Sequence, residues 1–241
     1  MSHEKKKFLI LAQSRSGTQL LRTLLHSHPD IHCDGELLHK NLEYTRFRWL
    51  RELSRVYPEP LLQHWQNKKS APVFGFNLMF YHMLLPKPTL RRLVNSNWHV
   101  IHLLREDLLQ IALSYLIASR SGEWHRQAGG RAPEHTFTIA PAELERELIK
   151  RSKWRAFEIE LVRGIPHQAV LYERDLLDSE HWQSTCDAIF GELQVDSSPV
   201  SSSFRKSDHR GPEQIIENFS ELRAWLLNSP FHPLLNTATQ N

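Results

Sequence analysis

The sequence predicts an α/β fold, in which a central and mostly parallel sheet is covered by helices on both faces. Short apolar runs, typical of strands buried on both faces, alternate with longer segments in which apolar residues recur at helical spacing. Such alternation is typical of parallel strands joined by crossover helices. The 241 residues are enough for one large domain with a sizeable core. We therefore expect a single domain over residues 1–241, with a loop or lid at 121–141.

The first strand and the first helix are predicted at the N-terminal end. Phe8–Ala12 is fully apolar, as a buried parallel strand would be. Leucines recur at helical spacing in Thr18–Ser27. His28-Pro29 ends this helix, because a residue that precedes proline is disfavoured in the α region.

The next two elements are a helix and a second strand. Leu42–Val56 mixes charged and apolar residues and predicts a helix, which Pro58 and Pro60 close. Ala71–Met79 predicts a strand, in which Gly75 allows the close approach of another group.

The middle of the chain predicts a third strand and two further helices. Trp98–Leu104 predicts the strand and Leu108–Ser119 the helix that follows it. Ser121–Pro141 contains three glycines and two prolines with little periodicity, and it predicts a long loop. Glu143–Val162 predicts a helix rich in charge.

The C-terminal part begins with a fourth strand over Ala169–Tyr172, which we expect to continue into a helix through Phe190. The Ser- and Pro-rich segment Val195–Pro212 predicts a loop. Glu213–Leu227 predicts a final amphipathic helix.

Composition excludes several classes of function. The 30 Lys and Arg against 27 Asp and Glu give a net charge of only +3, without a long basic block, so we expect no nucleic-acid partner. No apolar run approaches the roughly 20 residues of a membrane span, and the N-terminus lacks the pattern of a signal peptide. Cys33 and Cys186, far apart in sequence, demand no disulfide. We therefore expect a cytoplasmic protein.

The turn between the first strand and the first helix, AQSRSGT, predicts an anion site. The N-terminus of a helix presents unpaired N–H groups and a partial positive charge. Ser14, Ser16 and Gly17 are small enough for an oxyanion to lie against the backbone, Arg15 adds a planar cation, and Thr18 adds a hydroxyl. The alternative is an ordinary strand–helix turn with a capping serine.

Two other ligand classes receive less support from the sequence. The kinase-type motif G-x-x-x-x-G-K-[ST] is absent around Gly17, which argues against ATP. His26, His28, His32 and Cys33 fit no common zinc spacing, so we expect no metal site.

The string LAQSRSGTQLLRTLLHSHPDIHCDGEL closely resembles the sulfotransferases that use 3′-phosphoadenosine 5′-phosphosulfate (PAPS), and in particular their bacterial and Golgi carbohydrate branch. HLLREDLLQIALS is similar to a second element of that family, with Arg105 at the end of a strand and Ser114 on the next helix. SGEWH is similar to a segment of the bacterial trehalose-sulfotransferase-like group. LYERDLL and FRKSDHRGPEQIIENFSEL resemble two later segments of the family, in the same order.

The resemblance implies a three-layer α/β/α fold of the P-loop-NTPase-like type and a transfer reaction. A sulfuryl group would pass from PAPS to a hydroxyl of a carbohydrate or another small polar acceptor, releasing 3′-phosphoadenosine 5′-phosphate (PAP), without a metal. The choice between a monomer and a homodimer stays open. The residues expected to bind the donor are Ser14, Arg15, Ser16, Gly17, Thr18, Gln19, Arg105, Ser114 and Lys206.

One departure from the family concerns a lysine. The family often has Gly-x-Lys where this sequence has Gly75-Phe76-Asn77. The role of that lysine is therefore missing here, or Lys206 fills it.

Catalysis needs a base for the acceptor hydroxyl, and Glu36 in CDGEL is our first candidate, beside Arg15 as the residue that stabilises charge. His39 is the next candidate, because its ordinary pKa lies closer to neutral pH. The alternative for Glu36 is a solvated loop carboxylate. Trp124 either lines the acceptor site or packs at a loop edge.

Two rival functions stay open at this point. A nucleotide kinase or phosphatase would use Asp107 as its acid and would need magnesium. A catalytically silent PAP- or PAPS-binding protein would keep the loop, and Asn77 is the best support for it.

Overall fold

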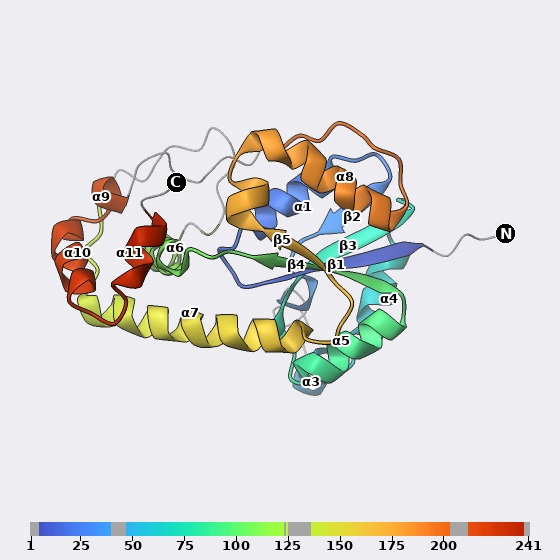
Figure 1. Cartoon of the computed structure of the whole chain (residues 1–241). Coiled ribbons are helices and arrows are strands. Elements are labelled where there is room, and N and C mark those ends of the chain that lie inside the picture. Colours follow the sequence, from blue (N-terminus) through green and yellow to red (C-terminus); the bar gives the residue numbers. More distant parts are fainter. Residues whose placement is uncertain (1–4, 40–46, 123, 125–135, 203–211, 239–241) are drawn as a thin grey trace. The chain divides into compact units, whose positions relative to one another are not determined.

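A parallel sheet forms the centre of the larger of two compact units. In this computed structural model, which describes residues 5–39, 47–122, 124, 136–202 and 212–238 (Figure 1), the sheet has five strands in the order β2-β3-β1-β4-β5. Every pair of neighbouring strands is parallel. The strands are β1 (Lys6–Ala12), β2 (Ile31–Asp34), β3 (Val73–Met79), β4 (Trp98–Leu104) and β5 (Gln168–Leu171).

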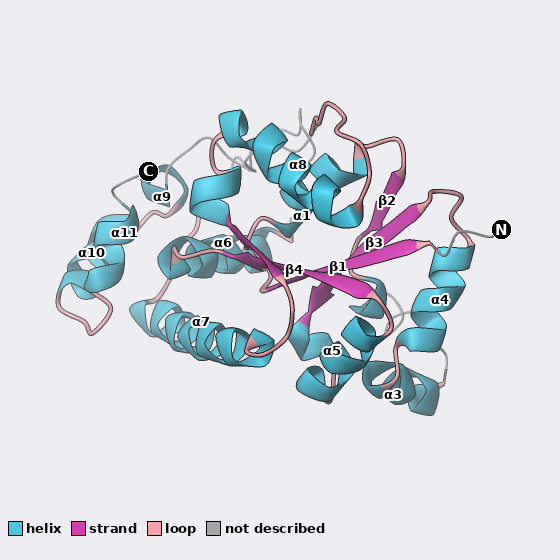
Figure 2. Ribbon diagram, turned by 45° about the vertical axis from the view of Figure 1, so that its right-hand side comes forward, coloured by secondary structure: helices cyan, strands magenta, loops and turns pink. Residues whose placement is uncertain are grey.

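The chain divides into two compact units. The first consists of Met1–Leu104 and Phe157–Ser202 and contains the sheet, and the second consists of Arg105–Ala156 and Ser203–Asn241. Besides the sheet, the first unit contains α1 (Thr18–His26), α3 (Arg48–Val56), α4 (Glu59–Asn67), α5 (Pro86–Asn95) and α8 (Trp182–Leu193). α1 and α8 cover one face of the sheet and α5 lies on the other, as the two views in Figures 1 and 2 show. The first unit thus has the three-layer α/β/α arrangement that the sequence predicts.

The second unit is helical. Its helices are α6 (Leu108–Ser121), α7 (Pro141–Val162, of which the part from Phe157 belongs to the first unit), α9 (Pro212–Ile215), α10 (Phe219–Leu227) and α11 (Pro233–Ala238). Leu109, Leu113, Leu148 and Leu222 pack in its own apolar core. The sequence predicted a single domain over 1–241, and the division into two compact units does not test that prediction. Most of the expected lid at 121–141 lies outside the described residues.

The core under α1 and α8 follows from the alternation of side chains along the strands. Phe8 and Ile10 of β1 point to this face and pack with Leu24 of α1 and Phe190 of α8. Gly75 of β3, which is paired with Phe8, makes room for the phenyl ring: an added Cβ would lie 2.1 Å from Cζ of Phe8. The group that approaches Gly75 closely, as expected from the sequence, is therefore the Phe8 side chain of the neighbouring strand.

The predicted strands are confirmed to within about two residues at each end, but two predicted helices are wrong as continuous elements. The segment after β5 forms a π-helical turn (Tyr172–Leu176) and a 3₁₀ turn (Ser179–His181) before α8 begins at Trp182. The predicted helix Glu213–Leu227 is divided into α9 and α10, because Ile216 bridges to Phe137 and interrupts it.

Four elements among the helices and strands of the described residues were not predicted: β2, α4, α5 and α11. Pro58 and Pro60, expected only to close a helix, lie at the start of α4, where the fixed φ of proline suits the first helical turn. Pro86 begins α5 in the same way. No helix in the described part of the chain combines the length and apolar character that a bilayer crossing requires.

Candidate active site

The carboxyl ends of the parallel strands bring several of the candidate residues to one edge of the sheet. Open α/β sheets bind ligands at this edge, where the strand order reverses. Here the reversal lies around β1, which pairs with β3 on one side and β4 on the other. The loop that follows β1, Gln13–Gly17, leads directly into α1.

The β1–α1 loop has an unusual backbone. Arg15 has a φ of 72° and Gly17 a φ of 92°, both in the left-handed region. A side chain costs free energy in this region, so arginine occupies its position against the ordinary preference. Backbone turns of alternating hand direct successive N–H groups toward one point and can hold an anion.

Gly17 is required by a contact as well as by its backbone angles. The ring of Tyr172, which follows β5, lies against it, and an added Cβ would be 2.4 Å from Cδ2 of that ring. Gly17 also occupies the N-cap position of α1 and has no side chain with which to cap the first-turn amides. Those amides are thus suited to an anionic ligand.

The side chains that flank the loop differ in accessibility. Ser14 and Arg15 are half-buried, whereas Ser16 and Thr18 are buried. Gln19 is engaged within α1, because Nε of Arg22 donates to its Oε1 at 2.7 Å. The structure therefore places Ser14–Gln19 together at the start of α1, as the sequence predicts.

Asn77 is a buried amide beside this loop. Its side chain is 0% exposed, and neither its Nδ2 nor its Oδ1 has a hydrogen-bond partner among the described residues. Because Asn77 pairs with Ile10 of β1, its side chain lies on the sheet face covered by α1. Buried amides without partners are costly, so a ligand that completes these hydrogen bonds offers a physical reason for the residue.

Glu36 lies near two histidines. It follows β2, and its Oε2 is 3.8 Å from Nε2 of His82, which follows β3. The rings of His82 and His39 are stacked, with centroids 5.4 Å apart and an interplanar angle of 16°. Sequence reasoning named Glu36 and His39 but missed His82. The sequence signal that could have indicated His82 is its position three residues after the end of β3, the strand that pairs with β2.

A buried polar group lies on the other face of the sheet. Nε2 of Gln13 donates to Oε2 of Glu158 at 3.3 Å, and Nε2 of His102 lies 3.5 Å from Oε1 of the same carboxylate. Both Glu158 and His102 have side chains that are 2% exposed. Gln13 is the residue before Ser14, so this group fixes the entry to the β1–α1 loop.

Arg105 and Ser114 belong to the second unit. Arg105 follows β4 and is half-buried, and its carbonyl accepts a hydrogen bond from Arg155. Ser114 is half-buried on α6. Lys206 lies outside the described residues.

Two further sequence candidates have local contacts of their own in the second unit. Asp107 caps α6, its Oδ1 accepting from the amide of Gln110 at 2.8 Å. Trp124 is 42% exposed and packs edge-on against Tyr115, with ring centroids 5.6 Å apart. This contact favours the packing alternative for Trp124.

The histidines near β2 are engaged in local hydrogen bonds. Nδ1 of His26 accepts from the amide of Cys33 at 3.1 Å, and both ring nitrogens of His28 bond to backbone groups, of Asp30 and Asp196. Within the described ranges, no group of three or more His, Cys, Asp and Glu residues is placed to hold a metal ion. Cys33 and Cys186 are buried free thiols, and burial raises the pKa of Cys186 to about 12.

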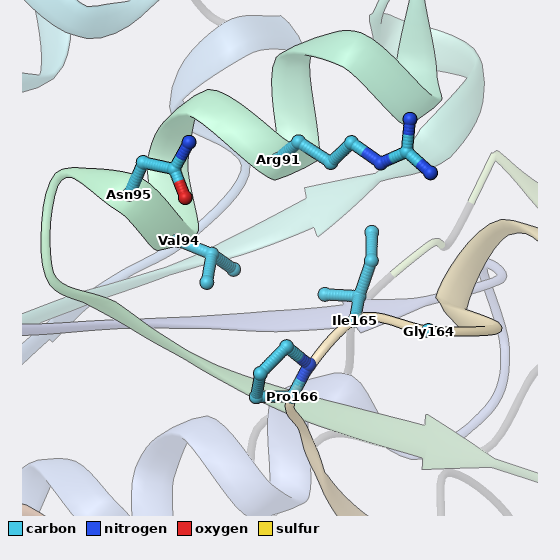
Figure 3. A pocket seen from close by; sticks show the side chains of 6 residues that line it. All are labelled: Arg91, Val94, Asn95, Gly164, Ile165 and Pro166. Carbon is cyan, nitrogen blue, oxygen red and sulfur yellow. The ribbon is translucent and has the colours of Figure 1, made fainter.

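A small hollow exists elsewhere on the first unit. It has a volume of about 250 Å³ and is lined by Arg91, Val94, Asn95, Gly164, Ile165 and Pro166 (Figure 3). These residues lie where α5 and α7 end, before β4 and β5 begin. The hollow is thus at the amino edge of the sheet and is separate from the candidate site.

The chain is similar to known proteins along most of its length. No protein-family model matches it. Nodulation protein H of Rhizobium meliloti is 24% identical over 241 aligned residues, which cover 94% of this chain and 93% of that protein. The protein of the same name from Rhizobium meliloti strain 1021 is 24% identical over 239 residues, 93% of this chain and 92% of that one.

A solved structure shares the fold. The crystal structure of a sulfotransferase from Alicyclobacillus acidocaldarius matches with a TM-score of 0.56 and 15% identity, over 96% of this chain and 93% of that chain. The P-loop-NTPase-like α/β/α class expected from the sequence is therefore confirmed.

Proposed function

We propose that this chain is a sulfotransferase that transfers a sulfuryl group from PAPS to a hydroxyl of a carbohydrate or another small polar acceptor and releases PAP. Its similarity to nodulation protein H along most of the chain, and the fold it shares with a solved bacterial sulfotransferase, support this proposal. The observation that carries this proposal is the β1–α1 loop. Two left-handed residues within it, Arg15 and Gly17, precede a helix whose first-turn amides have no cap from the N-cap residue. This combination suits the oxyanions of a phosphosulfate.

In sulfuryl transfer, as in phosphoryl transfer, the protein mainly positions the reactants and stabilises developing charge. PAPS supplies the activated sulfuryl group. In our proposal Arg15 and the loop amides bind the donor's oxyanions, with Ser14, Ser16, Thr18 and Gln19 around them. The buried amide of Asn77 supports a donor site at this place, because Nδ2 can donate to an anionic oxygen in the position where the resembling family carries a lysine.

Glu36 would take the proton from the acceptor hydroxyl. Its side chain is 25% exposed, so an acceptor can reach it, and it follows β2 at the same edge of the sheet as the β1–α1 loop. A carboxylate there acts as a general base. His39 is the second candidate for this role and is exposed.

Arg105 and Ser114 would hold the 3′-phosphate of the donor, with Lys206 as a further cation. This assignment rests on the resemblance of HLLREDLLQIALS to the family. For the rival phosphotransferase, Asp107 was the candidate acid, and its buried position as the cap of α6 gives that carboxylate a structural role instead.

Binding and turnover together test the proposal. We expect PAP to stabilise the protein against heat more than AMP or ATP does, because the 3′-phosphate would engage Arg105. A ligand at about 100 times its Kd stabilises the folded state by about 2.7 kcal/mol, which a melting curve resolves. Release of PAP from PAPS without added magnesium would then separate an enzyme from a silent binder. Equal shifts with PAP and AMP would overturn the assignment of Arg105 and Ser114.

A further inference from the structure

His82 lies close to the carboxylate of Glu36. It ends the 3₁₀ turn Phe80–His82, which follows β3, and the neighbouring strand β2 leads to Glu36. Nε2 of His82 is 3.8 Å from Oε2 of Glu36. Hydrogen bonds of catalytic groups are often this long before the substrate binds and shorten in the reacting complex.

The ring of His82 is held from several sides. The His39 ring stacks on it, and the Tyr81 ring meets it edge-on with centroids 5.0 Å apart. Arg55 of α3 fixes the backbone, because its Nε donates to the carbonyl of His82 at 3.1 Å and its Nη2 to that of Tyr81 at 3.5 Å. The imidazole therefore has little freedom to leave Glu36.

Four titratable groups in the described part of the chain face His82. They are Glu36 after β2, His39 three residues further on, Arg55 on α3 and Tyr81 in the same turn. Burial, followed by the effects of His39 and Arg55, lowers the pKa of His82 to about 4. The ring is thus neutral near pH 7, with one nitrogen as donor and the other as acceptor.

The tautomer follows from the surroundings. Nδ1 of His82 is buried and has no hydrogen-bond partner among the described residues, whereas Nε2 faces a carboxylate. An N–H facing a carboxylate is favourable and a lone pair facing it is not, so the proton belongs on Nε2. A neutral donor can orient a carboxylate without the large loss of basicity that a neighbouring arginine or lysine would cause.

From this geometry we propose that His82 is a positioning residue for the reaction: its imidazole donates from Nε2 to Oε2 of Glu36 and fixes the carboxylate toward the acceptor hydroxyl. The proposal rests on the proposed function of Glu36. His82 acts through Glu36, because its own side chain is only 8% exposed, against 25% for the carboxylate.

The kinetic test compares three variants of the full chain. His82→Leu removes the donor and should lower kcat about tenfold to a hundredfold, since misplacing a reacting group by about 1 Å costs about that much. The KM for PAPS and the Kd for PAP should stay within about twofold. His82→Gln, whose amide nitrogen can reach the position of Nε2, should recover most of the activity. His28→Gln changes a buried histidine that bonds to Asp30 and Asp196 and should leave kcat unchanged.

Additivity tells whether His82 works through Glu36. In a Glu36→Gln background, His82→Leu should cause no further loss of kcat, because residues that act as a unit are not additive. A kcat for His82→Leu equal to that of the wild type would overturn the proposal while leaving sulfuryl transfer intact. An undiminished loss in the Glu36→Gln background would overturn it too, since His82 would then act independently.

A spectroscopic measurement keeps the proposal testable even where a variant fails to fold or PAPS is not turned over. Nitrogen-15 NMR of the wild-type imidazole should show a neutral ring with its proton on Nε2 down to about pH 4. The Nε2 proton resonance should shift in Glu36→Gln. A ring protonated near pH 6.5, or with its proton on Nδ1, would refute the proposed hydrogen bond. Failure of wild-type turnover with the expected NMR signals would instead count against the proposed function.

Discussion

Substitution of Gly17 by alanine tests how the site is built, because one added carbon meets two separate obstacles. The residue has a φ of 92°, and its new Cβ would lie 2.4 Å and 2.7 Å from Cδ2 and Cε2 of Tyr172. Tyr172 cannot move away easily, since its ring is part of the core beneath α1 and α8. The alanine must therefore shift the β1–α1 loop, the ring, or both.

The two obstacles have separate magnitudes. A left-handed backbone costs a residue with a Cβ about 1–2 kcal/mol, and overpacking in a well-packed core costs a further ~1–3 kcal/mol. The lower entropy of alanine in the unfolded chain returns about 0.5–1 kcal/mol. The net expected loss is ~1–4.5 kcal/mol, a considerable part of the ~5–15 kcal/mol by which domains are stable.

Gly164 provides the matched control. It has a φ of 71°, and an added Cβ would meet nothing within 4 Å. Urea unfolding should therefore show a smaller loss for Gly164→Ala than for Gly17→Ala, the difference being the overlap with Tyr172. PAP affinity should fall only in Gly17→Ala. In a Tyr172→Leu background the added cost of Gly17→Ala should shrink toward that of the control. Equal losses in the two glycine variants would refute the packing argument.

Three further variants address the chemistry. Arg15→Ala should lower turnover of labelled PAPS by roughly 10²–10³-fold and leave the circular dichroism spectrum unchanged. The control Arg91→Ala, at an exposed arginine, should change neither turnover nor the spectrum. Near wild-type turnover in Arg15→Ala would show that Arg15 has only a structural role. Glu36→Gln should lower turnover by roughly 10²–10⁴ while calorimetry finds PAP affinity nearly unchanged, and normal turnover would pass the role of base to His39. Asn77→Leu removes a buried amide that has no hydrogen-bond partner in the described part of the chain, so stability should be unchanged or higher. PAP affinity should nevertheless fall roughly tenfold to a hundredfold, and unchanged affinity would exclude Asn77 from the donor site.

The sequence allowed the sheet to be predicted where strands are long and apolar. β4 was predicted residue for residue, and β1 and β3 to within two residues, because fully buried parallel strands have an unbroken apolar pattern. β2 has only four residues and alternates buried with half-buried positions, so its pattern resembles that of a loop. The helix expected after β5 failed for another reason. Its periodicity is real, but Leu177 bonds to Tyr172 and forms a π-helical turn.

The local part of the candidate site can be predicted from the sequence, whereas contacts between distant residues cannot. The loop Ser14–Thr18 is contiguous, so the sequence shows its glycine, its arginine and its position before a helix together. His82 is 46 residues from Glu36, and only the pairing of β2 with β3 brings their elements together. A single chain carries no local sign of that pairing. Tyr172 illustrates the same limit, since it follows β5 and only the strand order of the sheet brings it to Gly17, which follows β1.

The backbone of Arg15 differs from that of left-handed residues at ordinary helix termini. Among the described residues, the other non-glycine residues with positive φ are Asn97 and Gln194. Both follow the C-terminal ends of helices, α5 and α8, where a left-handed residue satisfies the last carbonyl groups. Arg15 instead precedes a helix, so it gains no such compensation. A strained residue persists only where its surroundings hold it, and strain of this kind concentrates at functional sites. Gln13, held by Glu158, and Gly17, held against Tyr172, are the two restraints on either side of it. The fold therefore keeps Arg15 in the turn before α1 against its own backbone preference, as the proposed binding of an anionic donor would require.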